Sequence, residues 1–234
     1  MRSQDCPNVL TFNSALKATK NALSTARTIL LLPGSAKSLI GQSLNLRKRY
    51  SSVRSVDELV SKHMPELIGY TATLDLGCGG NIRNPFGATK EFGVDIRNDL
   101  SENIKHADLS VEAIPFADDS FDFCTAFDVL EHIPRHSWAH GRTRMAFLDL
   151  MNEIHRVLKP GGFFLHSTPA YPSKQAFQDP THVNIITEDT IPNYFCEPCS
   201  WARNLGYGFS GSFELIEQRW LQNIWLVGIM KALK

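Results

Sequence analysis

The stretch LDLGCGGN, from Leu74 to Asn81, joins a short apolar run to a glycine-rich turn. Because glycine has no Cβ, Gly77 and Gly79 allow the backbone to turn sharply and to approach a ligand closely. Turns of this kind also arise by chance and on several folds, so one such motif does not define the ligand. The stretch therefore predicts a strand followed by a ligand-binding loop, and the ligand has to be inferred from the rest of the chain.

Strand and helix signals alternate after position 72, a pattern typical of a parallel sheet with helices on its faces. We expect strands at ATLDLG, EFGVDI, SFDFCTAFDVL and FFLHST. A helix with an apolar face from Phe147 to Leu158 should end at KPGG, and SFELIEQRWLQ should pair with IWLVGIMKAL. The predicted fold is α/β: a Rossmann-like doubly wound sheet, mostly parallel, with an antiparallel C-terminal edge hairpin, preceded by an N-terminal helical segment.

The first part of the chain differs in composition from the remainder. Residues 1–70 hold ten Lys and Arg against four Asp and Glu, whereas the rest holds fourteen against twenty. One capped helix is expected to end near Pro33. Further along the chain, the capping box SVDE, from Ser55 to Glu58, predicts the start of a second helix. We therefore divide the chain into an N-terminal helical segment or cap, residues 1–69, and a ligand-binding domain, residues 70–234.

The overall composition excludes several classes of protein. Lys and Arg together number 24, as do Asp and Glu, and this zero net charge argues against a protein that mainly coats nucleic acid. The apolar runs of the chain are shorter than the roughly 20 residues that span a bilayer. The stretch TILLLPG is unlike a secretory signal. Five cysteines without regular spacing fit a reducing compartment, so we expect a cytoplasmic protein. Cys196 and Cys199 form a CxxC, but a zinc site usually needs a second pair of ligands.

Candidate ligand-binding residues fall where the expected strands end. In a doubly wound sheet the ligand lies at the carboxyl ends of the strands, where loops converge. Asp95 ends the second expected strand, where its carboxylate can accept hydrogen bonds from both ribose hydroxyls of a nucleotide; the alternative is a turn residue. A dehydrogenase would share these features, but its GxGxxG fingerprint requires glycine where this chain has Ile82.

Further motifs follow in order between Leu74 and Pro169: LDLGCG, GVDI, ADLS, IPFADDSFDF, DVLEHI and EIHRVLKPGGFFLHSTP. This series resembles the class I S-adenosylmethionine-dependent methyltransferases of the methyltransferase type 11 group, from Ala72 to the end of the chain. The resemblance implies a methyltransferase domain in residues 70–234 with S-adenosyl-L-methionine as co-substrate. GNIRNPFGA and DPTH are similar to stretches of bacterial methyltransferases from surface-glycan and secondary-metabolite pathways.

The same resemblance implies roles for residues at matching motif positions. These are Asp75, Gly77, Cys78 and Gly79 for the methionine and ribose end, Asp95 for the ribose, Ile96, Asp108 and Leu109 for the adenine, and Phe127 for the methionine amino group. One departure is that Pro85 interrupts the segment where the family places its first helix, so we expect that helix to be short or irregular. Arg83 or Asn84 would then be alternative contacts for the cofactor.

Methyl transfer mainly requires that the acceptor be positioned in line with the S–CH₃ bond, because the sulfonium already makes its methyl group a good electrophile. A hydroxyl acceptor must also lose its proton, which calls for a general base, most often histidine. The candidates are His182, in the long segment after the fifth expected strand, and His132, after the fourth. Asp179 would orient His182, or help it to ligate a divalent metal that we do not predict, or only form a local turn.

The sequence favours a methyltransferase acting on a small molecule, with a hydroxyl of a sugar or glycan intermediate as the preferred acceptor. Trp138, Tyr171 and Phe177 are candidate aromatics of the acceptor pocket. One alternative is an RNA methyltransferase that uses the basic stretch Arg47–Arg54, although the net charge and the lack of an NPPY-like motif disfavour nucleic acid. Another is a non-catalytic S-adenosylmethionine-binding partner subunit. The oligomeric state is left open.

Overall fold

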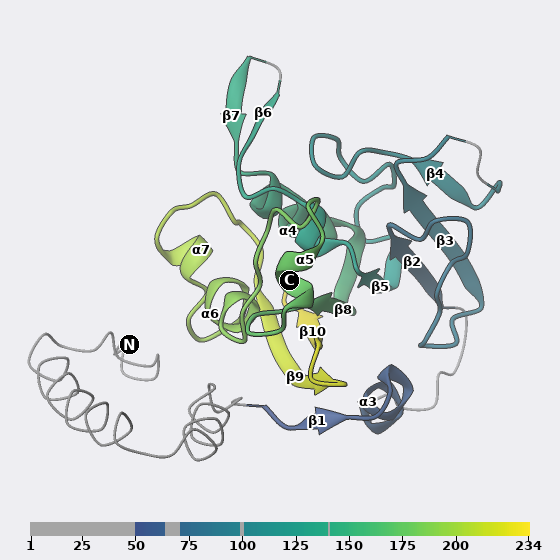
Figure 1. Cartoon of the computed structure of the whole chain (residues 1–234). Helices are drawn as coiled ribbons and strands as arrows, with labels where there is room; N and C mark the ends of the chain where they lie inside the picture. The colour runs from purple at the N-terminus through teal and green to yellow at the C-terminus, as the bar shows by residue number, and fades with distance from the viewer. Residues whose placement is uncertain (1–49, 64–70, 99–100, 140) are drawn as a thin grey trace, which may run out of the picture. The chain divides into compact units, whose positions relative to one another are not determined.

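One eight-stranded sheet forms the centre of the described part of the chain (Figure 1). The computed structural model describes residues 50–63, 71–98, 101–139 and 141–234. The helix expected near Pro33, the basic residues Arg47 to Arg49 and most of the predicted N-terminal segment lie outside the described residues.

The strands of this sheet are, in spatial order, β1 (Ser52–Val53), β9 (Phe213–Leu221), β10 (Trp225–Ala232), β8 (Leu158–Pro169), β5 (Phe121–Phe127), β2 (Ala72–Leu76), β3 (Lys90–Asp95) and β4 (Ile104–His106). A separate two-stranded hairpin, β6 (Ser137–Ala139) and β7 (Arg142–Arg144), projects from the body (Figure 1). The helices are α3 (Val56–His63), the 3-10 helix η1 (Leu130–His132), α4 (Ala146–Val157), α5 (Gln175–Gln178), α6 (Thr190–Phe195) and α7 (Trp201–Asn204).

The strand directions confirm the predicted doubly wound, mostly parallel sheet. β4, β3, β2, β5 and β8 are parallel neighbours, and β10 lies antiparallel between β8 and β9. The predicted C-terminal hairpin is therefore present, although β1 pairs with β9 and is the outermost strand on that side. The chain proceeds outward from β2 to β4 and returns to β5 on the other side of β2. Loops after β2 and β5 diverge at this reversal, which is where such sheets bind ligands.

The two faces of the sheet bury different layers, because neighbouring side chains on a strand point to opposite faces. On one face Phe164 packs in a cluster with the apolar side of α4, including Ile154. On the other face Phe123 packs with Leu59 of α3 and with Phe86. The Phe86 ring stacks on Phe123 with its centroid 4.4 Å away.

Phe86 belongs to the loop between β2 and β3, where the sequence predicted a short or irregular helix. The loop, residues 77–89, contains no helix, in agreement with the position of Pro85. Phe86, which is 4% exposed, covers the apolar surface of β5 that a helix would otherwise cover.

The end of α4 differs from the prediction. We expected the helix to continue through Leu158 to KPGG, but it ends at Val157 and Leu158 begins β8 with extended backbone. Pro160 disfavours helical backbone at Lys159, the residue before it, and Leu158 pairs with Phe121 of β5. At the other end of the described chain, half of the expected capping box forms: the Glu58 N–H donates to Ser55 Oγ, whereas the Glu58 carboxylate accepts the N–H of Arg54 and not that of Ser55.

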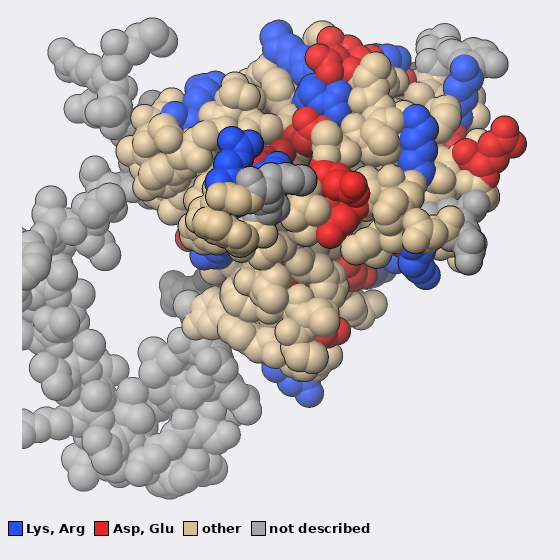
Figure 2. Space-filling view, turned by 90° about the horizontal axis from the view of Figure 1, so that it is seen from above, with Lys and Arg blue, Asp and Glu red and all other residues tan. Residues whose placement is uncertain are grey.

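Charged side chains are mixed over the face of the molecule shown in Figure 2, where basic and acidic groups lie among uncharged residues. Within the described ranges, no helix has both the length and the apolar character that crossing a bilayer requires.

Candidate active site

The carboxyl ends of β2, β3 and β5 surround a cavity of ≈ 390 Å³. The loops after these strands, and the loop after β4, supply its walls. The residues predicted for the cofactor that line it are Gly77, Asp95, Ile96, Asp108 and Leu109. Asp128, Val129, His132 and Pro134 complete the wall on the side of β5. We call this space the donor cavity.

Gly77 begins the wall on the side of β2 with backbone that only glycine adopts easily. Its φ is +64°, and a Cβ added to it would lie 2.3 Å from Val129 Cγ2. Its N–H donates to the Val94 carbonyl at 2.7 Å, which ties the turn to β3. The glycine therefore lets the loops after β2 and β5 pack against each other beside the donor cavity.

Asp95 holds the second glycine of the motif. Its Oδ2 accepts the Gly79 N–H at 2.8 Å, and its Oδ1 accepts the backbone N–H and Nε–H of Arg97 at 3.1 and 2.9 Å. Burial works to raise the pKa of Asp95, but these hydrogen bonds outweigh it and hold the pKa below the ordinary value. The ionised carboxylate still has acceptor capacity on Oδ2 for a ribose hydroxyl, because each oxygen has two lone-pair sites.

Asp75 lies behind the donor cavity and fixes the loop that follows β2. It accepts the Arg83 N–H at 2.8 Å and the Thr125 hydroxyl at 2.7 Å. Burial raises the pKa of this carboxyl to about 6. The Arg83 guanidinium carbon lies 4.8 Å above the ring centre of Phe127, so Arg83 contacts the predicted residue Phe127 and orders the same loop.

The remaining predicted cofactor residues have mixed positions. Cys78 is buried and does not line the donor cavity; a Cβ on Gly93 would lie 2.4 Å from its sulfur, and burial raises the pKa of its thiol to about 11. Ile96 is 61% exposed and is one of the apolar residues that line the cavity. Asp108 accepts the Ser110 hydroxyl at 2.6 Å, which orders the loop after β4. Asn84 closes its own turn by donating to the Ala88 carbonyl at 2.8 Å.

The two candidate bases, His132 and His182, are brought together although fifty residues of chain separate them. The N–H groups of Val183 and Asn184 both donate to the Glu131 carbonyl at 2.9 Å, which fastens the loop after α5 to η1. The two imidazole rings meet edge to face with their centroids 4.8 Å apart. Because His132 also lines the donor cavity, the pair lies at its edge.

Asp179 accepts the backbone N–H and the hydroxyl of Thr181 at 2.8 and 2.6 Å, so it forms the local turn that the sequence left as an alternative. These bonds, led by that from the Thr181 side chain, lower the pKa of the Asp179 carboxyl. The partner that orients His182 is the Gln175 carbonyl, 3.0 Å from Nδ1.

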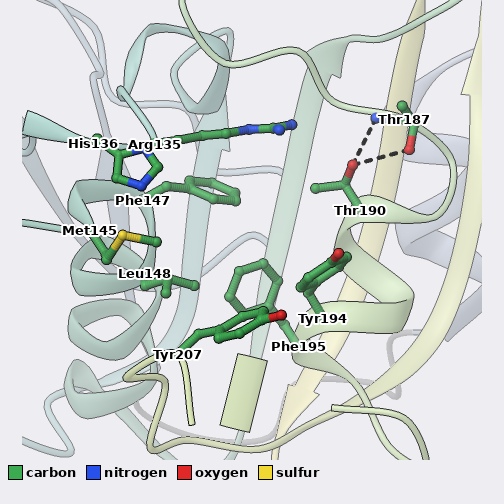
Figure 3. A pocket seen from close by; sticks show the side chains of 10 residues that line it. All are labelled: Arg135, His136, Met145, Phe147, Leu148, Thr187, Thr190, Tyr194, Phe195 and Tyr207. Atoms are coloured by element: carbon green, nitrogen blue, oxygen red, sulfur yellow. Dashed lines mark hydrogen bonds between the residues drawn. The ribbon is translucent and has the colours of Figure 1, made fainter. Parts of the chain in front are cut away.

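A second cavity, of ≈ 380 Å³, lies between α4 and α6 (Figure 3). It was not predicted from the sequence. Phe147 and Leu148 of α4 face Tyr194 of α6 across it, and Tyr207 and Arg135 close its ends. We call this space the aromatic cavity. Its residues come from separate short elements with no shared motif, so the sequence carried no signal that they converge.

Arg135 links the aromatic cavity to the histidine pair. Its Nε–H donates to Asn184 Oδ1 at 2.9 Å and its terminal nitrogen donates to the Ile185 carbonyl at 2.7 Å. Pro134, the residue just before it, lines the donor cavity. One short segment therefore contributes to both cavities.

The predicted aromatics line neither cavity. Trp138 lies on β6 and is 74% exposed, and Tyr171 and Phe177 contact each other edge to face near the surface. Cys196 of the CxxC is unsuited to metal or redox chemistry, because it is a free buried thiol against Met230, and burial raises its pKa to about 12.

Comparison with known proteins identifies the domain. Residues 74–166 match a family model described as a methyltransferase domain. No curated protein matches the chain. Similar solved structures include a chain from the complex of the Haloferax volcanii Trm112 methyltransferase activator with its methyltransferase (14% identity, 76% of this chain and 88% of that one, TM-score 0.51). The [4+2]-cyclase SpnF is 14% identical, over 86% of this chain and 94% of that one, with a TM-score of 0.51. An S-adenosylmethionine-dependent methyltransferase from Mesorhizobium loti is 16% identical, over 74% of this chain and 96% of that one, with a TM-score of 0.47.

The matched residues run from β2 into β8 and include most of the wall of the donor cavity. The protein is thus an S-adenosylmethionine-dependent methyltransferase, with S-adenosylmethionine as its co-substrate, as predicted. The roles of the individual cofactor residues stay predictions.

Replacing Gly77 by alanine should weaken binding of S-adenosylhomocysteine more than tenfold, because the new methyl group would clash with Val129, which lines the donor cavity. Gly87→Ala is the matched control, since Gly87 has a φ of +65° and open space where a Cβ would lie. Both variants bear a backbone cost of about 1 kcal/mol, but only the first disturbs the cavity. Calorimetric titration of both proteins checks this, and equal affinities would contradict the role given to Gly77.

Asp75 should make the folded protein less stable as the pH rises from about 4 to about 6. Its pKa is about 6 when folded, against an ordinary value of 3.8, so in this range the unfolded chain has released a proton that the folded chain retains. The free energy of unfolding should fall by about 3 kcal/mol relative to Asp75→Asn, which lacks this ionisation. Urea unfolding at several pH values measures the difference, and a flat difference would show that the carboxyl ionises normally.

Proposed function

We propose that the protein transfers the methyl group of S-adenosylmethionine to a hydroxyl of a small molecule, with a sugar or glycan intermediate as the preferred acceptor. The observation that carries this proposal is the pair of imidazoles, His132 and His182, at the edge of the donor cavity. A hydroxyl is the common acceptor that must lose a proton during attack, and imidazole groups suit that task near neutral pH.

The hydrogen bonds around the two rings support this role by defining their tautomers. The Thr181 hydroxyl donates to Asp179, so it accepts from Nδ1–H of His132, 3.0 Å away. A carbonyl oxygen can only accept, so Nδ1 of His182 carries the hydrogen that bonds Gln175. With the hydrogen on Nδ1, the Nε2 atom of each neutral ring keeps its lone pair. The proton of a hydroxyl acceptor would approach this nitrogen.

The donor would be held by the loops after β2, β3 and β4. Asp95 would accept from the ribose, and Ile96 and Leu109 would lie against the adenine, as the resemblance implies. With the acceptor oxygen in line with the S–CH₃ bond, about 3 to 3.5 Å from the methyl carbon, positioning supplies much of the rate. The protein's remaining task is to remove the hydroxyl proton at the histidine pair.

The aromatic cavity supports a sugar-containing acceptor. The rings of Phe147, Tyr194 and Tyr207 offer apolar faces, whereas Thr187 and Arg135 offer hydrogen-bonding groups around them. Pockets that bind small molecules combine a mainly apolar lining with a few polar groups in this way. A pyranose has apolar C–H faces and a rim of hydroxyls, so its two kinds of surface match those of the lining.

The proposal is tested by incubating the protein with methyl-labelled S-adenosylmethionine and three acceptor classes: sugar nucleotides and glycosides, matched aglycones without the sugar, and total RNA. We expect label in an alkali-stable methyl ether of the glycosides and none in the other two classes. Label in RNA, or equal labelling of the aglycones, would overturn the sugar acceptor.

Replacing His182 by alanine should reduce kcat for the hydroxyl acceptor by about 10² to 10⁴, the usual contribution of a group that moves a proton. Binding of S-adenosylhomocysteine should remain within twofold, because His182 does not line the donor cavity. His63→Ala is the control, since this imidazole lies on α3 and pairs with Glu217. Parental turnover by the His182 variant would show that the proton leaves by another route.

A further inference from the structure

We propose that Glu131, His132 and His182 bind a divalent transition-metal ion of the zinc class. One ligand atom from each of these residues can be chosen so that all lie within 4.8 Å of one another. Among the residues that the structure describes, no other group of three or more histidine, cysteine or acidic side chains has ligand atoms this close together. The inference deepens the proposed function, on whose hydroxyl acceptor its catalytic consequence rests: with the ion bound, the two imidazoles hold the metal, and the metal takes over from them the task of removing the hydroxyl proton.

The first support is that the imidazoles are already held as metal-binding histidines are held. In metal sites the ring nitrogen away from the metal usually donates to a carbonyl, carboxylate or water, which fixes the tautomer and the ring orientation. Here Nδ1 of His182 is bonded to the Gln175 carbonyl, and Nδ1 of His132 to Thr181. Both Nε2 atoms are left as lone-pair donors.

The second support is the buried carboxylate of Glu131, which is 1% exposed. Its Oε2 accepts the Thr168 hydroxyl at 2.7 Å, whereas its Oε1 is buried without a hydrogen-bond partner in the described part of the chain. A buried polar atom without a partner costs about 1 to 3 kcal/mol, so such atoms are rarely left unpaired. A cation between Oε1 and the two imidazoles would satisfy it.

The chemistry of the three donors selects the class of ion. Two imidazoles with one carboxylate form a set that zinc uses in catalytic sites, with further positions open, and that ferrous iron also uses. Magnesium and calcium prefer oxygen ligands throughout. Around a tetrahedral ion with bonds of about 2.1 Å the donor atoms would be about 3.4 Å apart, so donor atoms that are now up to 4.8 Å apart must approach by up to about 1.4 Å.

The position of the ion would explain how a hydroxyl acceptor loses its proton. His132 is exposed and lines the donor cavity, so open coordination positions would be accessible from that side. A hydroxyl oxygen that ligates the ion has a lowered pKa and releases its proton to water. The new O–CH₃ bond then forms as the S–CH₃ bond breaks, and the electron pair of that bond remains on sulfur in the neutral S-adenosylhomocysteine.

The test is calorimetric titration of the chelator-treated full-length protein with zinc chloride. We expect one equivalent to bind with a micromolar or lower Kd, and at least tenfold weaker binding in His132→Ala, His182→Ala and Glu131→Gln. His106→Ala is the control, because it removes an exposed imidazole outside the group. The two histidine variants keep the test decisive even if the buried Glu131 variant fails to fold, and the thermal unfolding transition of each variant reports that it is folded.

Absence of zinc binding, or binding that none of the substitutions weakens, would overturn the metal site. Metal binding is measured without any acceptor, so it can succeed or fail independently of the proposed function. If the chelated protein methylates a glycoside at the full rate, the hydroxyl acceptor stands and the catalytic use of the ion is overturned. If zinc binds as expected and the label enters RNA alone, the metal site stands and the proposed function fails.

Discussion

The donor cavity depends on a turn whose two glycines, Gly77 and Gly79, have positive φ angles that other residues rarely adopt. Gly77 packs its Cα against Val129 at positive φ, and the N–H of Gly79 is held by Asp95. The first contact joins the loops after β2 and β5, and the second joins the loops after β2 and β3. A Cβ on Gly77 would separate loops that must meet for one ligand to touch all three strands, and Gly79 has a φ of +62° that other residues rarely adopt. The cavity is therefore a consequence of backbone geometry before any contact with the co-substrate is made.

The missing first helix changes how that turn is supported. In a full βαβ unit a helix would cover the sheet next to β2, but here an irregular loop does so, with Phe86 on the ring of Phe123. In the absence of this helix, the buried Asp75 orders the loop by accepting a hydrogen bond from the Arg83 N–H. Its raised pKa is the electrostatic cost of that arrangement, since the carboxyl has lost water and gained only two donors.

The sequence predicted the fold well because its signals are local. Strand and helix periodicity, the glycine turn and Asp95 at the end of β3 can each be found within a few residues. The short polar strands β4, β6 and β7 were missed, since segments such as IKH and RTR show no apolar alternation. The end of α4 was misplaced because the helical spacing of Leu158 was given more weight than Pro160. The meeting of His132 with His182, and the aromatic cavity, arise from contacts between distant segments, which no single motif encodes.

The segment from Glu131 to Arg135 couples the parts of the site. The Glu131 carbonyl holds the loop that carries His182, Pro134 faces the donor cavity, and Arg135 enters the aromatic cavity and bonds the same loop through Asn184. A shift of this segment would therefore move the histidine pair relative to both cavities at once. Methyl transfer needs donor, acceptor and proton-accepting group aligned to within a fraction of an ångström. In the proposed reaction, this hydrogen-bonded segment would align donor, acceptor and base in the folded chain, so that binding would not have to create the alignment.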